Sequence, residues 1–194
     1  MIIQKIREKT LQYHDEFTGW AFKIFNGTIS IEEYKNALKV FYGFYKPVEE
    51  KMNVGNDKDF TLDMLKRIKL NLLINDMKNL GITQEEIDKI ECCTDLPEMN
   101  NQAQLLGCMY VIEGATLGGQ LVGGKLEEFL KLDGKGSEFF FSYKENTRPF
   151  WKEFMDYINE YSEKTSIEDP IIDSSHEMYM KFNKWLAKLK GITF

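Results

Sequence analysis

Histidine and cysteine are scarce in this sequence, and each scarcity excludes a class of protein. The chain of 194 residues contains two histidines and three cysteines. Cys92 and Cys93 are adjacent and poorly placed to pair with each other, and Cys108 lies alone in a helical pattern, so we expect incidental or structural thiols in a reducing compartment. Neither histidine lies three positions after a glutamate, which excludes a ferritin-like di-metal bundle, and histidine-rich zinc or Ser-His-Asp sites have no signal.

An excess of positive charge and a long apolar segment are also missing. The formal net charge of -6 argues against nucleic acid or anionic membrane as the main partner. No stretch offers about 18 uninterrupted apolar residues, and the start MIIQKIREKT lacks the apolar core of a signal peptide, so we expect a cytoplasmic protein. With 43% hydrophobic and 29% charged residues, the chain has the composition of one soluble domain, expected to span residues 1–194.

Alternating strand patterns, internal repeats and low-complexity linkers are absent, whereas apolar residues recur at helical spacing throughout. We therefore predict an all-α fold, a single-domain helical bundle. The first helix should end at Asn26-Gly27, and Ser30 with Glu33 forms a capping box that opens the second, which Pro47 should kink or break. Later helices are predicted over about 61–80 with Leu65 inward, after Thr83, from about Pro97 to 133–134, from 147–149 and from 169–170.

Glycine is abundant where a long helix is predicted. The stretch 110-YVIEGATLGGQLVGGKLEEF-129 carries five glycines, although each costs a helix interior about 1 kcal/mol relative to Ala. The spacing of phosphate-binding loops is missing, and charged residues interrupt any membrane-helix contact. Gly107, Gly114 and Gly118 share one helical face, so either a neighbouring helix packs tightly there, which is the commoner case, or a planar ligand lies on it. Gly119, Gly123 and Gly124 could give this helix a bend or flexibility.

His14 falls on the apolar stripe of the first helix, one turn from Thr10 and Phe17. A lone histidine on an apolar face is most often a hydrogen-bonded core residue and less often a ligand. One inward histidine and one helical face without side chains are together what a haem between two helices requires. Composition and spacing permit that arrangement without demonstrating it. His176, among polar residues of the last helix, is expected to be solvated or to act as a cap.

Six segments, in order, resemble the haem oxygenase family, most closely its soluble bacterial branch, which includes enzymes that supply biliverdin to bacteriophytochromes. The similarity covers nearly the whole chain. The segments are IREKTLQYH at 6–14, YGFYKPVE at 42–49, NDMKNLG at 75–81, YVIEGATLGG at 110–119, the aromatic residues at 140–143 with TRPFW at 147–151, and FNKWL at 182–186.

The resemblance implies an all-helical fold that holds haem b between two helices, with His14 as the iron ligand. It implies O2- and electron-dependent cleavage of haem, both cofactor and substrate, to biliverdin, CO and ferrous iron. A ferredoxin- or flavin-type reductase would supply electrons, and a bacteriophytochrome is a candidate acceptor of biliverdin. Cations at the pocket edge would bind the haem propionates. The expected catalytic residues are Gly114, Thr116 and Gly118, and the expected haem-binding residues are His14, Arg7, Thr10, Phe17, Tyr110, Gly114, Ala115, Gly118, Arg148 and Lys152.

Two positions depart from the family pattern. Many members carry an Asp directly after the first distal glycine, where it organises water that protonates the bound oxygen, but this chain has Ala115. Thr116, or water held by backbone carbonyls, is the expected replacement. An acid often follows the proximal histidine by one turn, and here Thr18 stands there. Two alternatives therefore remain: a haem-binding or haem-sensing protein that does not degrade haem, and a helical interaction protein with no haem site.

Overall fold

The computed structural model describes residues 1–27, 29–52 and 60–191, with their side chains except those of 14–25, 190 and 191. No strand occurs in this part of the chain, which confirms the prediction of an all-α fold. The elements are α1 (Ile2–Phe25), α2 (Ile31–Met52), η1 (Met64–Lys66), α3 (Leu70–Asn79), α4 (Gln84–Asp88), α5 (Gln102–Leu130), η2 (Lys144–Asn146), α6 (Thr147–Thr165), α7 (Asp169–Leu186) and η3 (Ala187–Gly191).

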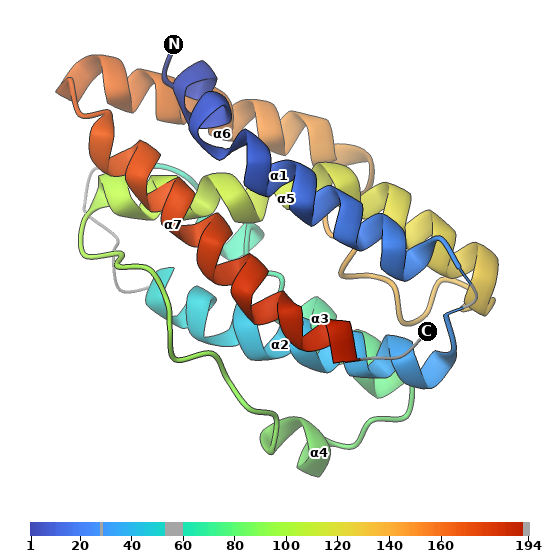
Figure 1. Cartoon of the computed structure of the whole chain (residues 1–194). Helices are drawn as coiled ribbons and strands as arrows, with labels where there is room; N and C mark the ends of the chain where they lie inside the picture. The colour runs from blue at the N-terminus through green and yellow to red at the C-terminus, as the bar shows by residue number, and fades with distance from the viewer. Residues whose placement is uncertain (28, 53–59, 192–194) are drawn as a thin grey trace.

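The long helix α5 lies in the middle of the bundle (Figure 1). Helix α7 packs along it, and α1 packs against α5, α6 and α7. Helices α2 and α3 form a pair on the other side of α7, and the short α4 lies at the periphery (Figure 1). Buried apolar side chains make one cluster between these helices, and its fully covered members include Ile6, Phe44, Leu106, Phe154 and Phe182. This cluster is what holds the amphipathic helices together.

Most predicted helix boundaries agree with the structure. Helix α1 ends at Phe25, and the Ser30–Glu33 capping box at the start of α2 is present in both directions. Thr83 and Glu86 form a second capping box at α4. Helices α6 and α7 begin at the predicted residues.

Pro47 was predicted to kink or break its helix, and a break is wrong, because α2 continues to Met52. Proline has no N–H, so the carbonyl of Gly43 one turn earlier loses its helical donor. The backbone N–H of Cys93 donates to that carbonyl at 2.7 Å. Gly43 allows this approach, since a Cβ there would overlap the carbonyl oxygen of Glu91 and lie 2.9 Å from the Trp185 ring. A neighbouring segment therefore replaces the missing bond, and the helix continues past Pro47.

The predicted starts of two helices are also wrong. Helix α3 begins at Leu70 because the Glu49 carboxylate accepts hydrogen bonds from Lys69 N and Leu70 N at its first turn. Before it, Met64–Lys66 forms a separate 3₁₀ turn, and Leu65, expected inward, is 83% exposed. Helix α5 begins at Gln102, where the Asn101 side chain caps it by accepting from Gln104 N. The predicted start at about Pro97 falls in a segment without regular secondary structure.

By length and composition alone, α5 could cross a membrane, and it is the one such helix among the described residues. More than half of its most apolar window, 56%, is buried inside the protein. Core helices of globular proteins have the same property, so this is weak evidence for a membrane span.

Candidate functional site

Three of the α5 glycines are explained by close packing. A Cβ on Gly107 would overlap the Ile171 carbonyl of α7 and lie 2.8 Å from Ser174 Cβ. A Cβ on Gly119 would lie 2.8 Å from the carbonyl oxygen of Phe140, and one on Gly123 would lie 2.7 Å from the Phe141 ring. These glycines admit neighbours, which is the commoner of the two predicted explanations, and α5 runs through them without a break.

Gly114 and Gly118 have no such neighbour in the described part of the chain. A Cβ on Gly114 would make only ordinary contact with the Trp151 ring, at 3.6 Å, and one on Gly118 would have nothing within 4 Å. Gly118 is exposed, and so are its apolar neighbours Leu117 (42%) and Leu121 (53%). The face that sequence spacing treated as one strip is thus divided: its Gly107 end is filled by α7, and its Gly118 end is open.

Helices α1, α5 and α6 meet beside Gly114. The ring of Tyr110 on α5 lies 5.5 Å from that of Trp151 on α6, measured between centroids. Burial raises the pKa of Tyr110, and the positive charge of Arg7 on α1 partly opposes this rise. The charge of Arg7 on α1 thus acts on Tyr110 of α5, and these two helices pack together. Thr10, about one turn after Arg7 in α1, is buried, and its hydroxyl donates to Ile6 O at 2.7 Å.

The remaining expected haem contacts are not brought together as a group by the described side chains. His14 and Phe17 lie in α1, but their side chains are outside the described part. Arg148 is exposed in the first turn of α6, one turn before Trp151. Lys152 is exposed too and pairs with Asp156 at 2.5 Å. Ala115 is half-buried and offers only a methyl group.

Thr116 is buried and His176 is half-buried. Thr116 is buried, and its hydroxyl donates to the carbonyl of Glu113 at 2.6 Å. Two positions along a helix correspond to about 200°, so Thr116 lies on the side of α5 away from Gly118. His176 is half-buried with its ring edge-to-face against Tyr13 at 5.0 Å, instead of being solvated as expected.

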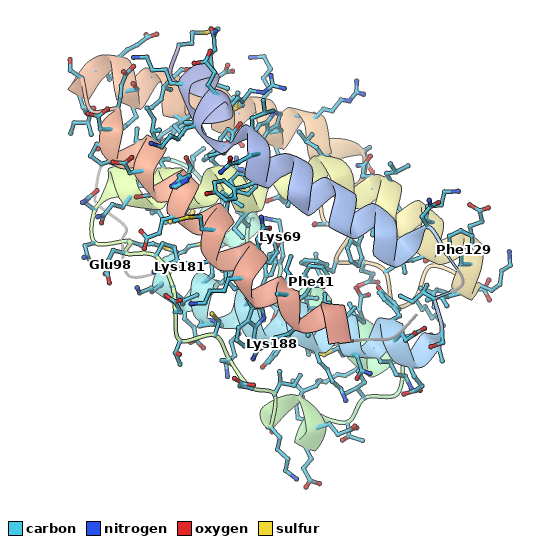
Figure 2. All side chains as sticks on the ribbon, in the orientation of Figure 1. Phe41, Lys69, Glu98, Phe129, Lys181 and Lys188 are labelled. Carbon is cyan, nitrogen blue, oxygen red and sulfur yellow. The ribbon has the colours of Figure 1, made fainter. Side chains whose placement is uncertain are left out.

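A buried cluster of charges behind Gly114 was not predicted from the sequence. The Glu113 carboxylate accepts hydrogen bonds from Arg67 Nη1 (2.5 Å), Lys69 Nζ (2.8 Å) and Tyr143 Oη (2.7 Å). Arg67, Lys69 and Glu113 side chains are each 1% exposed, and Figure 2 shows Lys69 in the interior of the bundle. Burial and the Glu113 charge raise the pKa of Tyr143, which stays the donor. The available signal was Glu113 itself, a charge inside the apolar run before Gly114.

No group of three or more histidine, cysteine, aspartate or glutamate side chains suited to a metal ion occurs among the described residues. Haem iron needs only one protein ligand, so this finding leaves the haem hypothesis open. A family model described as Heme oxygenase matches residues 1–188 of the chain. Comparison with curated protein sequences returned no match.

Proposed function

Because the chain belongs to the haem oxygenase family, we propose that it cleaves haem to biliverdin, CO and ferrous iron in a reaction that consumes O2 and electrons. The family implies haem as ligand and substrate and an oxidoreductase in general terms. Bound haem supplies the iron that activates O2. The protein supplies binding, orientation and exclusion of water.

The observation that carries the proposal is the open face at Gly118. A glycine inside a helix weakens it, and in the described part of the chain no neighbour of Gly118 requires its small size. Leu117 and Leu121 leave apolar side-chain surface exposed beside it. A flat apolar ligand would cover this surface, and the missing side chain would let it approach the α5 backbone. The described residues therefore fit one face of a haem.

We propose His14 as the iron ligand on the opposite face. Helices α1 and α5 pack together and run in the same direction (Figure 1). Arg7 lies near Tyr110, and a further seven residues on each helix, about 10 Å, lead to His14 and Leu117. The repeat of seven also returns to the same helical face, so His14 shares the side of α1 that carries Arg7. This register supports a haem held between His14 and Gly118.

Charged and aromatic residues around the open face have separate proposed tasks. Arg7 and Arg148 would pair with the haem propionates. Lys152 would do the same if its ion pair with Asp156 opened. Tyr110 and Trp151 would form an apolar wall at Gly114 that keeps water from the ligand. Thr10 and Phe17 would pack beside His14.

Proton delivery is proposed to use water held by backbone carbonyls of α5. Ala115 has no proton to give, and the Thr116 hydroxyl is already donated to Glu113 O on the other side of the helix. Thr116 therefore remains only the second candidate for this task. A ferredoxin- or flavin-type reductase as electron donor, biliverdin transfer to a bacteriophytochrome, and a cytoplasmic location complete the proposal.

A haem titration followed by turnover in air tests the proposal. The purified protein should take up haem with a Soret band, and a reductant with O2 should convert this band to biliverdin absorbance and release CO. If haem binds but stays intact, the catalytic proposal is wrong. The second candidate, a haem carrier or sensor of the same fold, is favoured by the absence of a polar group at Ala115, and that same outcome would support it. Without any uptake of haem, an interaction protein is the remaining reading.

Gly118→Ala, with Gly124→Ala as its matched control, tests the open face. Both positions have free space for a methyl group in the described structure, so both substitutions should stabilise the haem-free protein by about 0.5–1 kcal/mol. Only Gly118→Ala should also weaken haem binding, by about tenfold, because the methyl group separates haem from the helix. Equal haem affinity in the two variants would remove Gly118 from the site.

His14→Ala tests the ligand assignment directly. Loss of the protein ligand should change the Soret band of ferric haem and lower haem affinity, and added imidazole should restore the spectrum. An unchanged spectrum and affinity would show that His14 is a core residue.

A further inference from the structure

The buried charge cluster behind Gly114 joins four parts of the chain. Besides its bond to Glu113, Arg67 donates through Nη2 to Glu153 Oε2 at 2.7 Å and to Phe150 O at 3.4 Å, both on α6. Lys69 Nζ, also bonded to Glu113, donates to Arg67 O. The backbone N–H of Lys69 donates to the Glu49 carboxylate of α2. Helices α2, α5 and α6 and the segment before α3 are therefore fixed to one carboxylate.

Stability by itself is a weak explanation for this arrangement. Removing charges from water costs more than their attraction returns unless the geometry is very good, and packed apolar residues at such positions are often equally stable. Apolar contacts are not directional, whereas a carboxylate held by three hydrogen-bond donors fixes both the rotation of its helix about the axis and the position of the helix along that axis. Directional bonds here fix the part of α5 that immediately precedes Gly114.

The same cluster also fixes the side chain that covers Gly114. Phe150, whose carbonyl Arg67 contacts, is the neighbour of Trp151 in sequence. The Arg67 guanidinium lies over the Phe150 ring at 5.3 Å, and that ring stacks on Tyr143 at 4.5 Å. The buried charge cluster thus sets the position of α6 against α5. It thereby also sets the 3.6 Å spacing between the Trp151 ring and a Cβ on Gly114.

We propose that Glu113 is a positioning residue of the haem site: held by Arg67, Lys69 and Tyr143, it sets the angle and height of α5 at Gly114 and thereby selects which edge of the haem meets the bound oxygen. Glu113 acts through the backbone of Gly114 and does not touch haem. The inference rests on the proposed function, since selection among haem edges has meaning only if the ring is cleaved.

The test compares Glu113→Gln with Glu128→Gln, which changes an exposed carboxylate on the same helix that pairs with Lys125 at the surface. Amide hydrogen exchange of the haem-free proteins is measured first. Residues 110–118 should exchange faster in Glu113→Gln and unchanged in Glu128→Gln. With haem bound, Glu113→Gln should produce a broader mixture of biliverdin isomers and a kcat lowered by about threefold or more at similar KM.

Tyr143→Phe is the second variant and decides the case if Glu113→Gln does not fold. It deletes the hydrogen bond from Tyr143 Oη to Glu113 and the one that Tyr143 Oη accepts from Lys69 Nζ, and it keeps both cations bonded to Glu113, so it should shift the isomer mixture in the same direction by a smaller amount. A wild-type isomer ratio and wild-type exchange at 110–118 in a folded variant would overturn the positioning role. If the wild-type protein cleaves no haem, the proposed function fails, and the exchange comparison still decides whether Glu113 orders α5 at Gly114.

Discussion

Helix α5 uses glycine for opposite purposes where neighbours cover its backbone, here called the held side, and at the uncovered Gly118 end of the face that Gly107 shares, here called the open side. On the held side, Gly107, Gly119 and Gly123 let a helix, a carbonyl and an aromatic ring approach the backbone. On the open side, Gly118 has free space, and exposed leucines flank it. A glycine that is filled by a neighbour contributes to packing, whereas one left open, such as Gly118 or Gly124, reduces helix stability with no packing reason among the described residues. The difference lies in what surrounds each residue.

The largest expected effect is on the held side. Gly107→Ala would place a methyl group against the Ile171 carbonyl and the Ser175 N–H of α7. Neither backbone atom can rotate away, so the free energy of unfolding should fall by about 3 kcal/mol. Urea unfolding of this variant beside Gly124→Ala provides the measurement. If Gly107→Ala were as stable as the Gly124→Ala control, α7 would be able to move away, and the contrast between the two sides would be lost.

A pH effect of intermediate size should come from Asp76, which anchors the loop on the held side. Its buried carboxylate accepts hydrogen bonds from Glu138 N and Phe139 N, each at 2.8 Å, next to the segment that covers Gly119. Burial, the dominant cause, raises the pKa of Asp76 to about 6, although these two bonds lower it. The folded state thus binds this proton more tightly than the unfolded state, so the Asp76 contribution is present at about pH 4 and is lost as pH rises through about 6.

The expected size of that loss is about 2 kcal/mol, given two units of pKa and competing backbone bonds. The measurement is the unfolding free energy of the wild type minus that of Asp76→Asn, followed from pH 4 to pH 7.5. This difference should fall as pH rises. A flat difference would mean that the bonds to Glu138 and Phe139 offset burial and that Asp76 ionises normally.

The smallest stability effect is expected on the open side. Leu121→Ser changes a side chain that is 53% exposed, so the unfolding free energy of the haem-free protein should change by no more than about 0.5 kcal/mol. Haem affinity should nevertheless fall, because Leu121 lies beside Gly118 on the surface proposed to be covered. Phe129→Ser at the far end of α5 (Figure 2) serves as the exposed apolar control, since Phe129 is 38% exposed. Equal haem affinity in the two variants would show that the open face does not bind haem.

Helical periodicity and capping boxes were sufficient to predict the fold class and most helix starts, because they depend on residues close in sequence. The continuation of α2 past Pro47 and the exposure of Leu65 were missed because a distant group decides the local structure: Cys93 N–H at Gly43, and the Glu49 carboxylate at the start of α3. The start of α5 was missed although its Asn101 cap is local. The irregular segment before it is also held by a distant side chain, since Lys181 Nζ donates to Leu96 O.

Prediction of the site was limited by the same dependence on distant groups. Spacing identified the glycine face but could not show that α7 fills one end of it, since Ile171 lies far from Gly107 in sequence. Arg67 and Lys69 sit in a charged segment, LKRIKL, that reads like an exposed helix. Their burial follows from a single carboxylate on α5. Membership of the haem oxygenase family was predicted from ordered motifs, whereas the individual haem contacts remain predictions.

The hydrogen bond from Cys93 N–H to Gly43 O shows that the main chain of α2, and not only its side chains, binds a specific neighbouring segment. The acceptor exists because Pro47 lacks a hydrogen atom, and no side chain takes part in the contact. Alanine scanning of α2 would record packing losses at its large residues and miss this contact everywhere except at Gly43 and Pro47. At Pro47, a stronger helix former would supply a competing donor, so a substitution that improves helix propensity would loosen the attachment of a segment fifty residues away along the chain.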